Sequence, residues 1–278
     1  MMKIKKIFQM LRDVGYEPRR AELLALGGLF SRSNGSARVM LLEGPPGAGK
    51  TALAEAVAKA LGAPFVYALL HSWSDDQELF VGVDVAAAVA GDSDAVRQPG
   101  VLAVAAEKSQ QGLTVLCLDE IDKVQERTEN LLLDFLQTGR VPVRPGEHLQ
   151  ARLENLLVFL TSNGLRPLGE PLLRRCRRVR MSPLPVELVE RLVCEKTGAP
   201  KGVVRVARKL AYQLAEEEER VPSLQELQLM VEELMAVAES VDDVRLILGG
   251  WASHRGTVPK RSFIAPLWAE LIRSRREL

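Results

Sequence analysis

The segment Gly44–Thr51, with the sequence GPPGAGKT, sets the narrowest limit on the fold of this chain. It matches the pattern G-x-x-x-x-G-K-[ST] at every fixed position. An apolar run, Val39–Glu43, precedes it, and helical spacing begins at Thr51. Glycines let successive backbone N–H groups face one anion, and a helix N-terminus adds a favourable dipole. The segment therefore predicts a phosphate-binding loop between a strand and a helix.

Each residue type in this loop suits the binding of a nucleotide. Lys50 supplies a mobile cation for the β- and γ-phosphates, and the Thr51 hydroxyl can ligate Mg²⁺. We therefore expect ATP and Mg²⁺ as cofactors. The alternative, a glycine-rich turn that arises by chance, is disfavoured by the Lys-Thr pair and by the flanking strand and helix. The predicted nucleotide-binding residues of the loop are Gly44, Pro45, Pro46, Gly47, Ala48, Gly49, Lys50 and Thr51.

A second motif, Val115–Glu120, is an apolar strand that ends in two carboxylates. The carboxyl end of such a strand faces the phosphates in a sheet of this kind. We expect Asp119 to hold Mg²⁺ through water and Glu120 to polarise the attacking water. The alternative is an ordinary strand end with solvated acids, and the presence of the phosphate loop disfavours it.

A third apolar strand, Leu156–Leu160, runs into Thr-Ser-Asn163. Its end should lie beside the strand that carries Asp119. We expect Asn163 to lie near the γ-phosphate and to position water through a hydrogen bond. Asn163 could also serve as a turn former before Gly164, and the two roles are compatible.

The segment Leu172–Arg178, LLRRCRR, is rich in arginine. An arginine that reaches a neighbour's γ-phosphate stabilises charge in the transition state. Arg174 and Arg175, at the end of a short helical segment, are the better candidates for this role, because Arg177 and Arg178 enter a strand. A solvated basic face is the alternative.

Strands alternate with helices in the first part of the chain and helices alone follow, which predicts an α/β domain and then an all-helical one. Pro183 and Pro185 break the alternation. We expect a nucleotide-binding domain over residues 1–182, a helical lid over 183–240 and a C-terminal helical extension over 241–278. The predicted strands are Val39–Glu43, Phe65–Leu70, Thr114–Leu118, Leu156–Leu160 and Arg178–Met181. The predicted helices are Thr51–Leu61, Val101–Gln110, Glu129–Gln137, Val186–Lys196, Val203–Glu218, Leu224–Ala238 and Phe263–Arg276.

Composition excludes several classes of protein. The net charge of +1 argues against a uniformly basic nucleic-acid binder. No apolar run approaches the ~18 residues that span a bilayer, so no membrane association is expected. The start, Met1–Met10, has the pattern of a short amphipathic helix and not of a signal peptide. Three widely spaced cysteines form no metal or redox pair. We expect a cytoplasmic protein.

The motifs GPPGAGKT, LCLDEID, LTSN and LLRRC, in this order, resemble those of the AAA+ superfamily of ATPases, and within it the MoxR type with its CbbQ-like branch. The resemblance implies a five-stranded parallel sheet of order 5-1-4-3-2 with helices on both faces, and a helical lid. It also implies self-association into a ring, usually a hexamer, with each site at a subunit interface. Asn163 becomes the residue called sensor 1, and Arg174 or Arg175 becomes the arginine finger.

Other positions match the family less specifically. Asp13–Tyr16 lies where such proteins contact adenine, and Val221–Leu227 lacks the arginine often found in the lid. Val83–Pro99 and Gly139–Glu147 are placed like two inserts of this branch. Trp73 and Phe80 are candidates for gripping a protein client, with a packing role as the alternative.

Three functions remain open from the sequence. The leading one is a ring ATPase, MoxR-like and chaperone-like, that remodels or activates a protein partner of unknown identity. A nucleic-acid motor or loader is the runner-up, since clamp loaders also carry an arginine before a cysteine at this point. A nucleotide-dependent switch is the third. In the tail, Trp251, Phe263 and Trp268 favour a helix that docks onto the lid or a neighbouring subunit, although binding to nucleic acid is an alternative.

Overall fold

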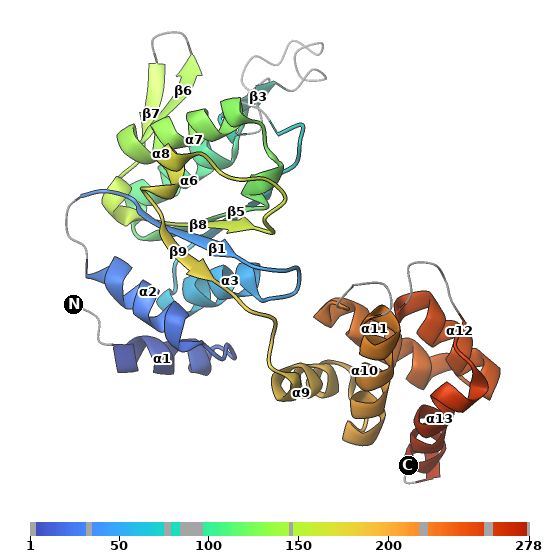
Figure 1. Ribbon diagram of the computed structural model, residues 1–278. Coiled ribbons are helices and arrows are strands. Elements are labelled where there is room, and N and C mark those ends of the chain that lie inside the picture. Colours follow the sequence, from blue (N-terminus) through green and yellow to red (C-terminus); the bar gives the residue numbers. More distant parts are fainter. Residues whose placement is uncertain are drawn as a thin grey trace. The chain divides into compact units, whose positions relative to one another are not determined.

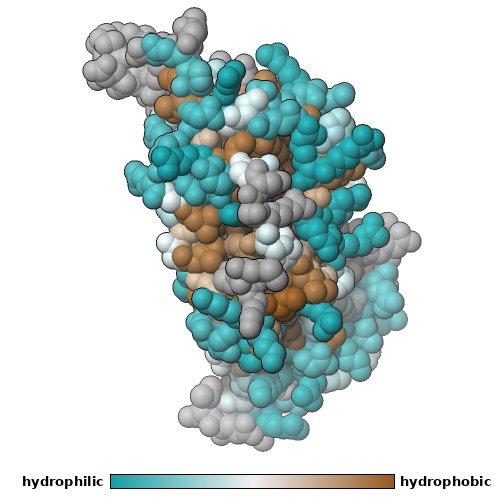
Figure 2. Space-filling view, turned by 90° about the vertical axis from the view of Figure 1, so that its left-hand side faces the viewer, coloured by the Kyte–Doolittle hydropathy of each residue, from teal (hydrophilic) through white to brown (hydrophobic). Residues whose placement is uncertain are grey.

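The computed structural model describes residues 4–31, 35–74, 79–83, 97–144, 147–216, 222–252 and 258–276. The chain divides into two compact units, Met1–Ser182 and Pro183–Leu278, each described by itself below (Figure 1). Figure 2 shows one face of the molecule, on which hydrophobic residues lie among hydrophilic ones.

The first unit is built on a parallel sheet of five strands in the order β2-β5-β8-β1-β9. Numbered along the chain among these five, the order is 5-1-4-3-2 when the sheet is followed from β9, as predicted. The strands read as continuous apolar runs because both faces of the sheet are covered, and every residue of β8 is buried. The bounds are β1 Arg38–Glu43, β2 Phe65–Leu69, β5 Thr114–Asp119, β8 Leu156–Ser162 and β9 Arg177–Arg180.

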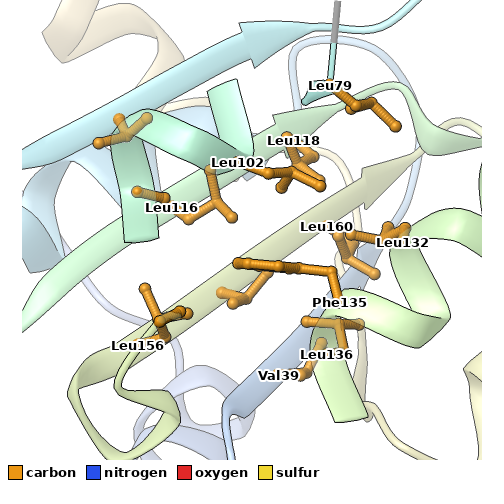
Figure 3. Close-up of a cluster of buried hydrophobic side chains, with 14 of the residues drawn as sticks. Val39, Leu79, Leu102, Leu116, Leu118, Leu132, Phe135, Leu136, Leu156 and Leu160 are labelled. Atoms are coloured by element: carbon orange, nitrogen blue, oxygen red, sulfur yellow. The ribbon is translucent and has the colours of Figure 1, made fainter. Parts of the chain in front are cut away.

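Alternate residues of these strands point to opposite faces, and each face has its own core. On one face, Met40, Cys117 and Phe159 pack against α1 (Ile4–Asp13), α2 (Arg20–Phe30) and α3 (Lys50–Leu61). On the other, Leu116, Leu118 and Leu160 pack against α6 (Val101–Gln111) and α7 (Glu126–Thr138). Figure 3 shows this second core, where Phe135 of α7 lies among the leucines of the strands. The fold therefore carries helices on both faces of the sheet, as predicted.

Short elements connect the main ones. They are β3 (Val81–Val83), β4 (Arg97–Pro99), the 3₁₀ turns η1 (Ile121–Lys123) and η2 (Leu153–Asn155), β6 (Arg140–Arg144), β7 (Glu147–Gln150) and α8 (Glu170–Leu173). The antiparallel pair β6–β7 occupies the position predicted for an insert before β8. Of the other predicted insert, residues 84–96 lie outside the described residues, and its two ends pair as β3 and β4.

The second unit consists of α9 (Val186–Thr197), α10 (Lys201–Glu216), α11 (Leu224–Val237), α12 (Val241–Ala252) and α13 (Arg261–Arg276). The helices α12 and α13 contribute Val244, Leu248, Ile264 and Leu267 to one hydrophobic core shared with α9–α11. Trp251, Phe263 and Trp268 pack against the same core. The helices of residues 241–278, predicted as an extension that docks onto the lid or a neighbouring subunit, thus share the core of the helical unit. No helix within the described ranges is long and apolar enough to cross a membrane.

The two aromatic residues singled out as client contacts have different surroundings. Trp73 is 84% exposed, whereas Phe80 is 7% exposed and packs in the core beneath α6 and α7. The proposed gripping role is therefore wrong for Phe80, because burial of the ring against leucines and alanines outweighs its position on a connecting loop.

Candidate nucleotide site

The segment Gly44–Gly49 joins β1 directly to the first turn of α3, as the motif predicts. Gly49 precedes the helix with φ 87° and ψ 23°, a left-handed conformation that a side chain would disfavour. Leu53 and Ala54 of α3 are fully buried, which fixes the helix on the sheet. The loop and the helix N-terminus therefore present backbone N–H groups and a positive dipole end to one place, which suits a phosphate chain.

The ammonium group of Lys50 lies at the centre of the site. Its Nζ atom donates to the carbonyl oxygens of Gly44, at 2.7 Å, and Pro45, at 2.9 Å, and to Oδ1 of Asn163, at 2.7 Å. These three acceptors match the three N–H bonds of an ammonium group. Lys50 is 7% exposed, and this burial lowers its pKa, while Asp119, Asp122 and Glu120 act in the opposite direction.

The carboxylate of Asp119 is held from several sides. Its Oδ2 atom accepts hydrogen bonds from the hydroxyls of Thr51, at 3.0 Å, and Tyr67, at 3.1 Å. Its Oδ1 atom accepts one from the hydroxyl of Thr161. Thr51 and Asp119 thus place two oxygens side by side where the sequence predicts Mg²⁺. In the described part of the chain no three His, Cys, Asp or Glu side chains cluster as a metal site. Two protein oxygens suit Mg²⁺, which usually retains waters and phosphate oxygens as further ligands.

Glu120 has an unusual backbone. With φ 60° and ψ 46° it is left-handed, and it is the only such non-glycine residue in the described ranges. Its N–H donates to the hydroxyl of Thr161 at 2.9 Å, which helps to hold the turn. Backbone strain of this kind is typical of functional sites. The conformation directs the side chain of Glu120 towards Asn163 and Lys123 instead of along the strand direction.

Asn163 connects Lys50 to Glu120. Its Oδ1 atom accepts from Lys50, and its Nδ2 atom donates to Oε1 of Glu120 at 2.9 Å. The other oxygen of Glu120 lies 2.6 Å from Nζ of Lys123. A hydrogen bond and an ion pair to Glu120 raise the pKa of Lys123. The site is therefore one connected polar network that contains the predicted cation, water-polarising acid and water-positioning amide.

The structure places Arg174 and Arg175 apart from this network. Arg174 follows α8, with its Nε atom 3.6 Å from Glu170, and its side chain is 78% exposed. Arg175 donates to the carbonyl oxygen of Pro171 at 2.7 Å. Within the described residues, no hydrogen bond or ion pair joins either arginine to the phosphate loop or to Asp119, Glu120 or Asn163. Neither guanidinium group therefore takes part in the polar network of its own chain.

Four residues of the network were missed by sequence reasoning: Tyr67, Thr161, Asp122 and Lys123. Thr161 lies inside the LTSN motif, so its polar side chain at a buried strand end was a usable signal. Tyr67 lies on β2 and its role depends on pairing with β5. Burial, the charge of Asp119 and the hydrogen bond to it raise the pKa of Tyr67 to about 12, so this hydroxyl stays a proton donor.

The segment predicted to contact adenine adjoins a buried ionic group. The Tyr16 hydroxyl donates to Glu22 at 3.2 Å, and Nη1 of Arg19 lies 3.6 Å from the same carboxylate. Nη2 of Arg19 donates to the carbonyl oxygen of Ala48 in the phosphate loop at 3.0 Å. Asp13, at the end of α1, accepts a hydrogen bond from Gln9. The region after α1 therefore contacts the loop through Arg19, a residue that the sequence pattern did not single out.

Comparison with known proteins agrees with this geometry. Residues 39–176 match the model of the AAA domain (dynein-related subfamily). Lon protease 2 of Borreliella burgdorferi is 30% identical over 157 residues, covering 52% of this chain and 18% of that protein. The Lon proteases of Magnetococcus marinus and Frankia alni are 29% and 25% identical, over 62% and 82% of this chain. The matched part spans about a fifth to a quarter of those two relatives, 20% and 26%.

The phosphate loop, the parallel sheet and the acidic strand end define a nucleotide-binding protein of the P-loop class. Within it, residues 39–176 match an AAA domain, and a helical unit follows.

Proposed function

We propose that this chain hydrolyses ATP to ADP and phosphate, with Mg²⁺, and that it does so as a ring that remodels or activates a protein partner. The observation that carries the proposal is the hydrogen-bonded series Lys50–Asn163–Glu120, next to the paired oxygens of Thr51 and Asp119. A phosphate-binding cation, a carboxylate and a metal-binding pair are the groups that phosphoryl transfer to water requires.

Each group has a distinct task in this proposal. The backbone of Gly44–Gly49 and the ammonium of Lys50 bind and orient the phosphates. Thr51 and Asp119 hold Mg²⁺, which neutralises charge on the phosphate oxygens when bound. Glu120 accepts a proton from the attacking water, and Asn163 keeps that carboxylate oriented by its hydrogen bond. Lys50 would exchange contacts with the loop carbonyls and Asn163 for contacts with phosphate.

The ring is the second part of the proposal. Arg174 and Arg175 are free of their own site, so we assign them to the site of a neighbouring subunit in a hexamer. The TSN and RRC segments support the MoxR-type branch, and with it a protein client instead of a proteolytic substrate. We propose a cytoplasmic location.

Two substitutions test the chemistry. Lys50→Ala should abolish nucleotide binding, whereas Glu120→Gln should retain binding and lose turnover, because only the proton acceptor is removed. Lys59→Ala, on the exposed side of the same helix α3, is the matched control and should behave as wild type. Near-normal ATP hydrolysis by the Glu120→Gln protein would refute the assignment of Glu120.

Two measurements test the ring and its partner. Light scattering with ATP should show an assembly of about six subunits, and a monomer that hydrolyses ATP at full rate would rule out shared sites. Single- or double-stranded DNA should leave the ATPase rate unchanged. Stimulation by DNA that falls steeply with salt would favour the nucleic-acid motor instead, since phosphate contacts release counterions.

A further inference from the structure

The segment 163–169 connects the water-positioning Asn163 to the helix α8 that precedes the two arginines. Its first part is held by Asp122, which is 3% exposed and follows Glu120 by two positions. The Oδ2 atom of Asp122 accepts from the backbone N–H of Asn163, at 3.1 Å, and of Leu165, at 2.9 Å. The start of the segment is therefore fixed to the turn that carries the catalytic carboxylate.

The second part of the segment is held by Glu129 of α7. This residue is 4% exposed, and each of its carboxylate oxygens has one partner. Oε2 accepts from Nη2 of Arg166 at 2.9 Å, and Oε1 accepts from the backbone N–H of Gly169 at 2.6 Å. Nε of Arg166 donates at 3.0 Å to the carbonyl oxygen of Val124, which follows η1. A buried carboxylate requires such partners, so this arrangement fixes Gly169 relative to α7 and η1.

Gly169 immediately precedes α8, which comprises only Glu170–Leu173. A helix this short has little stability of its own, so its position depends on its anchors. One anchor is Leu172, which is 1% exposed, and the other is the contact of Gly169 with Glu129. The backbone N–H groups of Arg174 and Arg175 bond to Glu170 and Leu172, so the arginines move with α8.

We propose that Glu129 and Arg166 are positioning residues. They fix the position of Arg174 and Arg175 relative to the nucleotide bound by the neighbouring subunit. The proposal rests on the proposed function, since it assumes a site shared between subunits. Through Asp122 and Arg166, the same contacts link the turn after Glu120 to α8. Each subunit therefore aligns the arginines that it offers to its neighbour by contacts to its own active-site turn.

The test uses Glu129→Gln in the full-length protein. A glutamine has one oxygen and one NH₂ group, so its nitrogen must face either Arg166 or the N–H of Gly169, both of which are donors. Side-chain size is unchanged. Glu126→Gln, one turn earlier on α7 and exposed, is the matched control. Arg166→Lys keeps the charge but loses the guanidinium that contacts both Glu129 and the carbonyl oxygen of Val124, and it serves as a second variant if Glu129→Gln does not fold.

The expected result has three parts. Glu129→Gln should bind a fluorescent ATP analogue as tightly as wild type, because its phosphate loop is intact. Its kcat should fall by about tenfold or more, since misplaced arginines lose part of the large rate effect of an arginine finger. Addition of excess Lys50→Ala subunits should restore part of the lost rate, because they bind no nucleotide but offer correctly placed arginines. If Glu129 had only a structural role in its own subunit, such mixing would not restore the ATPase rate.

Three results would contradict the proposal. Loss of nucleotide binding, or a rate that excess Lys50→Ala subunits do not restore, would overturn the positioning role and assign Glu129 to its own site. A wild-type rate for Glu129→Gln, with loss of activity in Arg174→Ala/Arg175→Ala, would overturn this inference and leave the proposed function standing. Full activity in the double arginine variant would instead refute the shared site itself, and this inference with it.

Discussion

The Nζ atom of Lys123 lies 2.6 Å from Oε2 of Glu120, the carboxylate oxygen that does not face Asn163. Both oxygens of Glu120, the residue proposed to activate water, are therefore in contact with donors of its own chain. The side chain of Lys123 is 40% exposed, so this ion pair is in contact with solvent and easily exchanged. Lys123 therefore restrains the carboxylate of Glu120, and the carboxylate can still exchange this contact for one with water.

Lys123→Met should raise kcat by up to about fivefold with little change in KM for ATP. The substitution frees one oxygen of Glu120, and a solvent-exposed ion pair of this kind restrains that oxygen only weakly. Steady-state ATPase rates measure the effect, with Lys108→Met on the exposed side of α6 as the control. A decrease in kcat of tenfold would show that Lys123 assists the reaction and does not restrain it.

Tyr67→Phe should weaken the apparent affinity for Mg²⁺ by about two- to tenfold, the equivalent of one hydrogen bond of about 0.5–1.5 kcal/mol. The Tyr67 hydroxyl bonds to Oδ2 of Asp119, the oxygen that also contacts Thr51, and so it orients the metal ligand. The measurement is ATPase rate against Mg²⁺ concentration at saturating ATP. An unchanged Mg²⁺ dependence would mean that Thr51 and Thr161 suffice to orient Asp119.

Glu22 should make the stability of the protein depend on pH with a defined sign. Burial raises the pKa of Glu22 above its ordinary value of 4.5, although contacts with Arg19 and Tyr16 oppose the shift. The folded state therefore binds the proton more tightly. The contribution of protonated Glu22 to the free energy of unfolding is fully present at a pH below 4.5. It is lost as the pH rises through the pKa that Glu22 has in the folded state.

Since Glu22→Gln cannot titrate, the melting temperature of wild type minus that of the variant should decrease as pH rises above 4.5 and then level off. Melting curves at a series of pH values measure this difference. Glu55→Gln on the exposed face of α3 should give a flat difference. A difference that grows with pH would show that Arg19 dominates over burial.

Leu267→Ala should lower the free energy of unfolding of the helical unit by about 2–5 kcal/mol, as expected for a fully buried leucine. Leu267 lies on α13, in the core shared with α9–α11. Urea unfolding followed by circular dichroism measures the change, and Leu246→Ala, which is 60% exposed, is the control. Nucleotide binding should be retained, because the phosphate loop belongs to the other unit. Equal stability of the two variants would contradict a structural role for the tail.

The sheet could be predicted because its signals are local. Apolar runs, the glycine loop and the two carboxylates are contiguous in the sequence, and a parallel sheet brings their carboxyl ends together. The meeting of Glu120 with Asn163 follows from the neighbouring strands β5 and β8, whose register pairs Leu118 with Leu160. The approach of these two side chains to each other could therefore be predicted from the sequence.

Other features depend on contacts that no local pattern encodes. Lys123 reaches Glu120 only because the left-handed backbone of Glu120 starts a tight turn. The helix α12 contains two adjacent glycines, which disfavour a helix, yet it forms through packing on α11 and α13. For Phe80 the sequence left client contact and packing both open, and only the tertiary contacts show that the ring packs in the core.

The chain leaves the first unit directly beside the start of the phosphate loop. Met181, the second-last residue of that unit, donates its N–H to the carbonyl oxygen of Glu43 at 2.7 Å. A side chain at Gly44 would collide with the carbonyl oxygen of Met181. The absence of a side chain at Gly44, the first residue of the phosphate loop, thus also leaves room for the backbone that leads to the helical unit. A Gly44→Ala protein would therefore confound two defects, and lost activity in it could not be attributed to phosphate binding alone.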